Sequence, residues 1–408
     1  MRSTKYLLIG GGLASSQAAR EIRDGDPDGS ILLVGEEAHV PYDRPPLSKE
    51  FLRGEKTSDE LSFEPESFYR EQRIDLALGC RVIALDPAAK SATLAGGETL
   101  AFEKALIATG GRPVRLDLSG AGLPGVHTLR TMGDAMAIAA DAVPGRRAVL
   151  VGAGFIGLEL AASLTQRGVH VTVVETEPRI WPRFADERLA DHVQAFCEKK
   201  GVTFVTSDAV REIEGNDAIH AAATKGGRQL RCDLICIGVG IAPNVELARD
   251  AGLAVNNGST VDDRMRTSHP DIYAAGDVAN YTDPISGRRR RVEHWGHAEY
   301  TGQLAGRNMA GGEGSYDLVT YVWSDLFDLH LEFAGDEGDH DEAIVRGSLE
   351  ENAFIQLYLK DGRLRAYFAI NGNAKDFPVL QRLIKQRKDL GDRKAALEDP
   401  DFALRGLL

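Results

Sequence analysis

The sequence YLLIGGGLAS at residues 6–15 returns in a similar form as AVLVGAGFIGLE at residues 148–159. Each stretch is a short apolar run that ends on a glycine-rich turn and continues into residues with helical periodicity. Gly10 and Gly152 are 142 positions apart, as are Gly12 and Gly154, so a whole strand–turn–helix unit is repeated. Alternating apolar strands and helices predict a parallel α/β sheet in each copy.

The two turns have the chemistry of phosphate sites. A strand that turns on glycines into a helix directs free backbone N–H groups and the positive end of the helix at a phosphate. An acidic residue follows the next apolar run of each copy, Glu36 lying 26 residues after Gly10 and Glu175 lying 23 after Gly152. This spacing is near the ~20 residues expected for a carboxylate that binds an adenosine ribose. The repeat therefore predicts two dinucleotide sites, and a flavin with a nicotinamide is the pair that exchanges hydride directly.

The expected fold class is α/β, with two dinucleotide-binding (Rossmann-like) domains, the second inserted into the first, plus a C-terminal α+β domain. Apolar runs at residues 105–108 and 234–237 close the two copies, and a run at 272–275 is assigned back to the first. From residue 323 onward the pattern changes to alternating strands and a basic helix. The predicted boundaries are 1–112 and 242–322 for the first domain, 113–241 for the second and 323–408 for the third.

The charge and the apolar content of the chain exclude some classes of binding partner. Lys and Arg number 48 against 61 Asp and Glu, which gives a formal charge of -13. Such a chain repels nucleic acid and anionic membrane surfaces. Its apolar runs are far shorter than the ~20 residues of a membrane span, and its first residues lack the features of a signal peptide. We expect a soluble, cytoplasmic protein.

Metal and thiol chemistry are not expected. The four cysteines, Cys80, Cys197, Cys232 and Cys236, have neither CxxC nor zinc spacing. We interpret them as apolar core residues in a reducing compartment.

The segment PYDRPPLSK at residues 41–49, read with the glycine turns, makes a family recognisable. The chain resembles the flavoprotein reductases of bacterial oxygenase systems, the ferredoxin and rubredoxin reductases, and their relatives among apoptosis-inducing factors. The resemblance covers essentially the whole chain and rests on GGGLAS, PYDRPPLSK, ATGGRP, LRT, GAGFIGLELA, VVE, GVGIAPN, YAAGDVA, RVEHWGHA and VWSD. It implies an NADH-dependent ferredoxin reductase that contains FAD.

The resemblance also implies the residues of both cofactor sites. Those expected at FAD are Gly10, Gly12 and Ala14 at the pyrophosphate, Glu36 at the ribose, Arg44 and Lys49 on the flavin side, Val82 at the adenine, Arg130 at the phosphates, Asp277 at the ribityl chain, Trp295 at the ring edge and Trp323 over the ring. Those expected at NADH are Gly152, Gly154, Ile156, Gly157, Glu175, Arg183 and Gly240.

Lys49 and Glu159 are the catalytic candidates. Reducing a flavin builds negative charge, which a nearby cation stabilises. An ammonium in a partly dry site tends to lose its proton unless a carboxylate pairs with it. Because Glu159 follows the second glycine turn on its helix, we expect it to form an ion pair with Lys49; the alternative is that both are solvated surface charges.

The second ribose carboxylate bears on the choice of nicotinamide. Glu175, reinforced by Glu177, repels a 2′-phosphate and favours NADH. Arg179 and Arg183 are the opposing observation, since an arginine nearby can accommodate NADPH. NADH is the preferred prediction.

The electron acceptor is expected to be an acidic iron–sulfur protein, a 2Fe-2S ferredoxin or a rubredoxin. No cysteine lies near residues 41–49, so a thiol relay is not expected and electrons leave the flavin directly. Docking of an acidic carrier needs a basic patch, which residues 288–291 or a group on the last predicted helix could form; that group is Arg382, Lys385, Arg387 and Lys388. The alternative is a solvated loop and a solvated helix face.

The role of two histidines and two alternative functions stay open. His294 and His297 flank Trp295, and packing near a helix start is favoured over a role at the flavin. An alternative function is that of an apoptosis-inducing-factor-like protein, which forms a charge-transfer complex with NADH and acts through partner binding. A third is an NADH oxidase that reduces oxygen.

Overall fold

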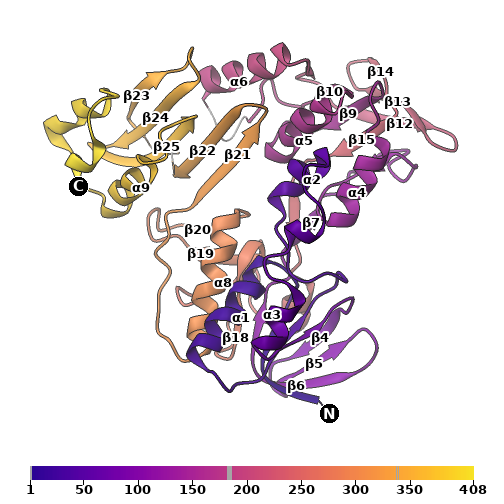
Figure 1. Ribbon diagram of the computed structural model, residues 1–408, viewed down its shortest axis with the longest axis vertical. Helices are drawn as coiled ribbons and strands as arrows, with labels where there is room; N and C mark the ends of the chain where they lie inside the picture. Colours follow the sequence, from indigo (N-terminus) through magenta and orange to yellow (C-terminus); the bar gives the residue numbers. More distant parts are fainter. Residues whose placement is uncertain (1, 182–185, 337, 339) are drawn as a thin grey trace. The chain divides into compact units, whose positions relative to one another are not determined.

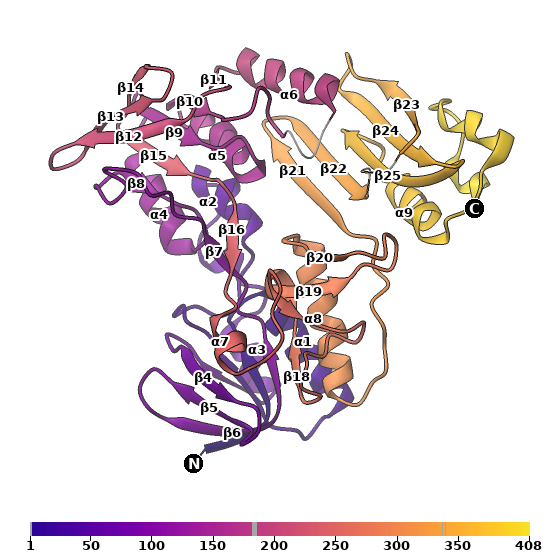
Figure 2. The ribbon, with the colours of Figure 1, turned by 180° about the vertical axis from the view of Figure 1, so that it is seen from behind.

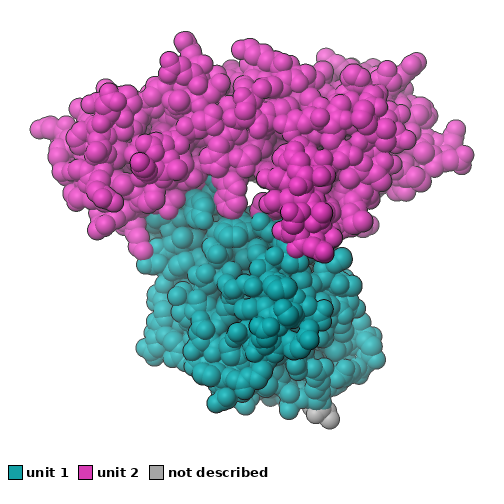
Figure 3. All heavy atoms as spheres, in the orientation of Figure 1, with its two compact units in different colours: residues 1–43, 61–112, 242–322 teal, residues 44–60, 113–241, 323–408 magenta. Residues whose placement is uncertain are grey.

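The computed structural model describes residues 2–181, 186–336, 338 and 340–408 (Figure 1). They divide into two compact units, coloured separately in Figure 3. Unit 1 comprises residues 1–43, 61–112 and 242–322, and unit 2 comprises residues 44–60, 113–241 and 323–408.

Unit 1 contains a seven-stranded sheet, and the first glycine turn directly follows β1, one of its inner strands. Six of its strands follow the order β3-β2-β1-β6-β5-β4. The seventh, β18, pairs with the last residues of β6, whereas β5 pairs with its first residues. β1, β2, β3, β6 and β18 are mutually parallel where they pair, and β4, β5 and β6 form an antiparallel meander. The strands are β1 (Arg2–Ile9), β2 (Ile31–Val34), β3 (Ile74–Ala77), β4 (Val82–Asp86), β5 (Ser91–Leu94), β6 (Thr99–Ile107) and β18 (Ile272–Ala274).

Two long helices pack side by side against this sheet (Figure 1). They are α1 (Leu13–Gly25) and α8 (Trp295–Met309), and the shorter helices of the unit are α3 (Glu66–Glu71) and α7 (Glu246–Asp250). Gly302 of α8 faces α1 so closely that a Cβ there would lie 2.4 Å from the carbonyl oxygen of Ala14. The contact brings the start of α8 to the same edge of the unit as the glycine turn.

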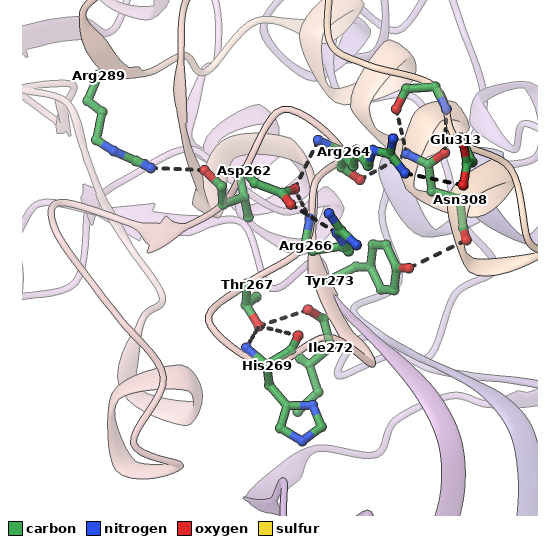
Figure 4. Close-up of polar contacts among 12 residues, drawn as sticks. Asp262, Arg264, Arg266, Thr267, His269, Ile272, Tyr273, Arg289, Asn308 and Glu313 are labelled. Carbon is green, nitrogen blue, oxygen red and sulfur yellow. Dashed lines mark hydrogen bonds and ion pairs between the residues drawn. The ribbon is translucent and has the colours of Figure 1, made fainter.

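A small three-stranded sheet completes unit 1, with β17 (Ser259–Thr260), β19 (Ala279–Thr282) and β20 (Arg289–Arg291). The loop that leads from β17 to β18 is held by polar contacts (Figure 4). Asp262 accepts the backbone N–H groups of Arg264 and Arg266, and the side chain of Asn308 donates to the carbonyl of Arg264. These bonds hold the loop that precedes β18.

Unit 2 contains the second glycine turn on a five-stranded parallel sheet in the order β11-β10-β9-β15-β8. The strands are β8 (Val126–His127), β9 (Arg147–Val151), β10 (His170–Val174), β11 (Thr203–Val205) and β15 (Leu234–Ile237). The helices are α4 (Met132–Asp141), α5 (Phe155–Gln166) and α6 (Glu187–Lys199). An antiparallel sheet packs against the parallel sheet (Figure 2), built of β12 (Val210–Gly215), β13 (Ile219–Thr224) and β14 (Gln229–Arg231).

Residues 44–60 belong to unit 2. They form a 3-10 turn at Pro45–Ser48 and the short helix α2 (Glu50–Arg53), which contacts α4 and α5. Two short strands, β7 (Gly111–Pro113) and β16 (Ile241–Pro243), lie where the chain leaves and re-enters unit 1. The domain boundaries given from the sequence stay a prediction.

The C-terminal part of unit 2 is a five-stranded sheet in the order β21-β22-β25-β24-β23, with one helix. Its elements are β21 (Tyr321–Leu326), β22 (Leu329–Gly335), β23 (Glu342–Ser348), β24 (Ala353–Lys360), β25 (Arg363–Ile370) and α9 (Phe377–Gln386). This is the expected α+β module. With the two repeated strand–turn–helix units, β1-α1-β2 and β9-α5-β10, it confirms the predicted fold class.

Among the described residues, no helix is both long enough and apolar enough to cross a membrane.

Candidate active site

The first glycine turn leaves the start of α1 without a protein cap. Gly12 is the N-cap residue, no side chain caps it, and the first turn of the helix has no acidic residue. Helix α4, by contrast, begins with a capping box formed by Thr131 and Asp134. The N–H groups at the start of α1 therefore present an anion site suited to a pyrophosphate.

The turn itself requires glycine. Gly10 has φ +127°, and a Cβ there would lie 2.2 Å from the carbonyl oxygen of Ala108 at the end of β6. Ala14 and Ser15 follow in the first turn of α1 and are buried. The hydroxyl of Ser15 has no hydrogen-bond partner among the described residues, as a group that awaits a ligand would.

The second turn repeats this arrangement in unit 2. Helix α5 begins after Gly154, again with no side-chain cap and no acidic residue in its first turn. A Cβ at Gly157 would lie 2.1 Å from the carbonyl oxygen of Gly152, so only glycine lets the helix start this close to the turn. Ile156 and Gly240 are exposed beside it.

The two ribose candidates differ in their surroundings. Glu36 follows β2 on the surface of unit 1, and one of its oxygens is 3.9 Å from a guanidinium nitrogen of Arg81. Glu175 follows β10 and turns toward the second glycine turn, where it accepts the N–H of Ala153 at 2.8 Å and the N–H of Glu177 at 3.0 Å. Its carboxylate is thereby fixed beside the start of α5. Val82, the adenine candidate, is buried in β4.

Of the two arginines that could favour NADPH, the structure describes only Arg179. Arg179 pairs with Asp191 at 2.8 Å and with Glu187 at 3.2 Å, both on α6. Its charge is therefore balanced by carboxylates of the protein. Arg183 lies outside the described residues.

The expected ion pair is present in unit 2. Nζ of Lys49 lies 2.8 Å from Oε1 of Glu159, and both side chains are almost fully buried, at 7% and 4% exposure. The alternative of two solvated surface charges is wrong. The 3-10 turn with its two prolines, Pro45 and Pro46, stiffens the backbone that carries Lys49.

Two serines that the sequence analysis missed complete the site of this carboxylate. Ser48 donates to Oε2 of Glu159, and Ser324 donates to Oε1 at 2.7 Å. Glu159 thus receives one ammonium and two hydroxyl groups, which satisfies a buried charge. Both serines stand inside quoted motifs, PPLSK and VWSD, and a small hydroxyl next to each key residue was the available signal.

Three more FAD candidates, Arg44, Arg130 and Trp323, belong to unit 2. Arg44 donates to the backbone carbonyl of Arg130, so two of the FAD candidates are neighbours. Trp323 is half-buried in β21, immediately before Ser324. Of the FAD candidates, Arg44, Lys49, Arg130 and Trp323 belong to unit 2, and the others belong to unit 1.

In unit 1, Asp277 and Trp295 stand at the starts of two helical segments. Asp277 lies in the 3-10 turn Gly276–Val278 after β18, and Trp295 is the first residue of α8. Nε1 of Trp295 donates to Oδ1 of Asp43 at 2.8 Å, a contact that orients the indole and that the sequence analysis missed. The start of α8 has neither a side-chain cap nor an acidic residue in its first turn.

Burial keeps both histidines beside Trp295 uncharged near neutral pH. Burial lowers the pKa of His294 to about 4 and that of His297 to about 3. The ring of His297 stacks on Tyr281 with centroids 4.8 Å apart, and its Nδ1 is 3.1 Å from the hydroxyl of Tyr316. For His297, these contacts agree with the favoured packing interpretation.

Comparison with known proteins gives the family. A family model described as pyridine nucleotide-disulphide oxidoreductase matches residues 4–302, and one described as reductase C-terminal matches residues 321–408. The chain belongs to the pyridine nucleotide-disulphide oxidoreductase family.

Relatives within this family match the chain over almost its whole length. The anthranilate 1,2-dioxygenase system ferredoxin–NAD(+) reductase component of Burkholderia cepacia is 35% identical, over 94% of this chain and 95% of the relative. The rubredoxin–NAD(+) reductase of Pseudomonas putida is 35% identical over 90% and 95%. The crystal structure of a covalent putidaredoxin reductase–putidaredoxin complex matches with a TM-score of 0.94 and 29% identity, over 100% of this chain and 98% of that chain.

The disulphide chemistry in the name of the pyridine nucleotide-disulphide oxidoreductase family has no counterpart in the cysteines of this member. All four are free, and Cys197, Cys232 and Cys236 are buried. Burial raises the pKa of each of these three thiols to about 12, so they carry no thiolate at neutral pH. Cys80 packs against the core of unit 1. No cluster of potential metal ligands occurs among the described residues.

The two basic segments differ in how many of their cations are paired within the protein. Arg290 pairs with Asp283 at 3.0 Å and Arg291 pairs with Glu293, so the run at residues 288–291 does not present four cations to solvent. On α9, Arg382 and Lys385 are exposed, and Arg387 just beyond the helix is exposed as well. Lys388 donates to the backbone carbonyl of Leu407.

Proposed function

We propose that this chain is an FAD-containing reductase that takes hydride from NADH and passes electrons singly to a small iron–sulfur carrier, a 2Fe-2S ferredoxin of an oxygenase system. The observation that carries the proposal is the presence of two glycine turns that open uncapped helices, each followed by a carboxylate. The relatives named as ferredoxin and rubredoxin reductases support the same reaction.

The residues of unit 1 fit the adenine dinucleotide part of FAD. The uncapped start of α1, the unpartnered hydroxyl of Ser15 and the exposed carboxylate of Glu36 are the groups that a pyrophosphate and a ribose require. Asp277 and the uncapped start of α8 add an acceptor and N–H donors for polar groups of the flavin half. When bound, FAD supplies the hydride acceptor and the store from which electrons leave one at a time.

The second site fits NADH better than NADPH. Glu175 is fixed beside the start of α5, where it accepts ribose hydroxyls and repels a 2′-phosphate. Arg179 pairs with two carboxylates of α6, which compete with a phosphate for its charge. We therefore expect a higher kcat/KM for NADH than for NADPH, and the reverse ratio would contradict this assignment.

Lys49 and Glu159 are the catalytic residues of the proposal. A buried ammonium places a fixed positive charge where a hydride acceptor gains negative charge, with little solvent to reorganise. Glu159, held by two serines, pairs with Lys49 and holds its ammonium in place. The pair works by electrostatics and positioning, without a covalent intermediate.

Electrons leave without a thiol relay in this proposal, because the three buried cysteines are protonated and Cys80 is partly buried against the core of unit 1. An acidic redox carrier in the cytoplasm is the acceptor that we propose. Docking then depends on exposed cations, of which Arg382 on α9 is one.

The test is a cytochrome c reduction assay with NADH. The carriers are a 2Fe-2S ferredoxin, a rubredoxin and a no-carrier control, and the purified protein is first checked for bound flavin. Rapid reduction that needs the ferredoxin supports the proposal. A colourless protein that cannot be reconstituted with FAD contradicts it. So does a persistent long-wavelength band with NADH that no carrier discharges, which would instead favour the apoptosis-inducing-factor-like function.

A further inference from the structure

Asp325 and His330 face each other across the hairpin of β21 and β22 in unit 2. Oδ1 of Asp325 lies 2.7 Å from Nδ1 of His330, and the two side chains are 44% and 45% exposed. Asp325 directly follows Ser324, whose hydroxyl donates to the buried Glu159. The hairpin therefore connects a solvent-accessible imidazole with the strand that contacts the catalytic ion pair.

Cations from residues 44–60 act on the same carboxylate. The hydrogen bond from His330 is the main cause that lowers the pKa of Asp325, and the positive charges of Lys49 and Arg53 lower it further. Lys49 is also 2.8 Å from Glu159. Its ammonium is thus attracted by two carboxylates. One is the buried Glu159, and the other is Asp325, which is hydrogen-bonded to the half-exposed His330.

The other charged groups around the hairpin have partners of their own. Burial raises the pKa of Glu332, on the same strand as His330, and its carboxyl accepts the hydroxyl of Tyr367. The hydrogen bond with Asp325 is the main cause of the raised pKa of His330, and the charge of Glu332 adds a smaller part. Arg53 is held by Glu55 at 2.7 Å, and Lys200 by Asp328 at 2.6 Å in the hairpin turn. The side-chain oxygen of Asn371, at the end of β25, accepts the backbone N–H of His330. Of the groups named, His330 is the one whose ordinary range spans neutral pH.

We propose that His330 is a positioning residue that sets, through Asp325, the positive potential of Lys49 toward the hydride acceptor. The inference rests on the proposed function. With a proton on His330, the imidazolium balances Asp325, and Lys49 interacts mainly with Glu159. With His330 neutral, Asp325 carries an unbalanced negative charge, which weakens the positive potential at Lys49.

The first experiment measures the coupling without catalysis. The pKa of His330 is followed by NMR of its ring proton in the holoenzyme, in Asp325→Asn and in Lys49→Met. Because linkage is reciprocal, loss of the Lys49 charge raises the pKa of His330, and loss of Asp325 lowers it. His127 is the matched control, since it pairs with Asp141 at the same 2.7 Å elsewhere in unit 2.

An unchanged His330 titration in Lys49→Met, with Asp325→Asn lowered as expected, would overturn the proposal. Equal shifts of His330 and His127 would also overturn it, because they would indicate a global change. If Lys49→Met does not fold, Arg53→Gln removes the other cation that acts on Asp325, and the same upward shift of the His330 pKa is required.

The second experiment follows the reaction with NADH. In anaerobic stopped-flow measurements, kcat/KM for flavin reduction by wild type falls about two- to fivefold as pH rises through the pKa of His330, an effect typical of a half-exposed pair. His330→Gln loses this step and His127→Gln keeps it. A step retained in His330→Gln overturns the inference. Absence of reduction by NADH in every variant refutes the proposed function instead, while the NMR linkage still decides whether His330 is coupled to Lys49.

Discussion

Glu159 is a buried carboxylate whose three donors come from separate segments of the chain. Lys49 and Ser48 lie before it in the sequence by about a quarter of the chain's length, and Ser324 lies well after it. A buried charge is tolerated only when its attraction to a partner and its hydrogen bonds offset the loss of hydration. The group is therefore sensitive to the removal of any one member.

Removing one partner of the Lys49–Glu159 ion pair should destabilise the protein more than replacing both partners with apolar residues. We expect Glu159→Ala to lower the free energy of unfolding by about 3–5 kcal/mol, since Lys49 is left buried without its carboxylate. The double variant Lys49→Met with Glu159→Leu should recover most of this loss. Urea unfolding measures both, with Glu187→Ala, whose side chain is 79% exposed, as the control at under about 1 kcal/mol. Equal losses in Glu159→Ala and Glu187→Ala would contradict the account.

His297, a buried histidine of unit 1, predicts a loss of stability in acid. The folded pKa of His297 is about 3, below the ordinary value of 6.5, so the unfolded chain binds the proton more readily. Its contribution is complete above pH ~6.5 and is lost as pH falls toward about 3. The loss is about 2 kcal/mol at pH 5. His297→Phe keeps an aromatic ring against Tyr281 and should flatten this slope in unfolding measurements. The exposed variant His170→Gln is the control, and equal slopes in both variants would refute the prediction.

At the scale of elements, the packing of α8 on α1 decides where the first glycine turn lies. α8 follows α1 in the chain by more than 250 residues, yet Gly302 approaches the backbone at Ala14 in the first turn of α1. That approach is possible only without a side chain at Gly302. The geometry of the turn therefore depends on a helix that the repeated motif does not include.

Adding one methyl group at this contact should disturb both the fold and the flavin site. Gly302→Ala places a Cβ 2.4 Å from the carbonyl oxygen of Ala14, and overpacking of this kind costs about 1–3 kcal/mol. We expect lower thermal stability and less bound FAD per protein after purification. In Gly133→Ala on α4 the Cβ meets its nearest atom at 3.7 Å, so the same exchange should be neutral or stabilising. An equal effect of both exchanges would exclude the steric explanation.

At the scale of the whole molecule, a net charge of -13 opposes the approach of an acidic carrier. Docking then depends on local exposed cations, and internal ion pairs remove Arg290 and Arg291 from the candidates. The exposed cations of α9 remain, together with the exposed Arg288 and Arg289.

Carrier turnover should therefore respond to salt and to α9. We expect kcat/KM for a 2Fe-2S ferredoxin to fall with rising ionic strength. Arg382→Glu should lower it about two- to fivefold at low salt. Arg70→Glu on α3 makes the same charge change at another exposed position and should have a smaller effect. A flat salt response, or equal losses in the two variants, would remove α9 from the docking surface.

The sequence by itself determined the repeated strand–turn–helix units, the C-terminal α+β module and the pairing of Lys49 with Glu159. The first two follow from glycine spacing and strand periodicity, which are local properties. The pairing follows from the need of an ammonium in a partly dry site for a carboxylate, together with the place of Glu159 on the helix after the second glycine turn. Only the tertiary structure decided which hydroxyl groups complete Glu159, that Asp43 orients Trp295, that Arg290 turns inward, and that His330 reaches Asp325. A sequence states which side chains can donate or accept, but partners distant in the chain are selected by the packing of the elements that carry them.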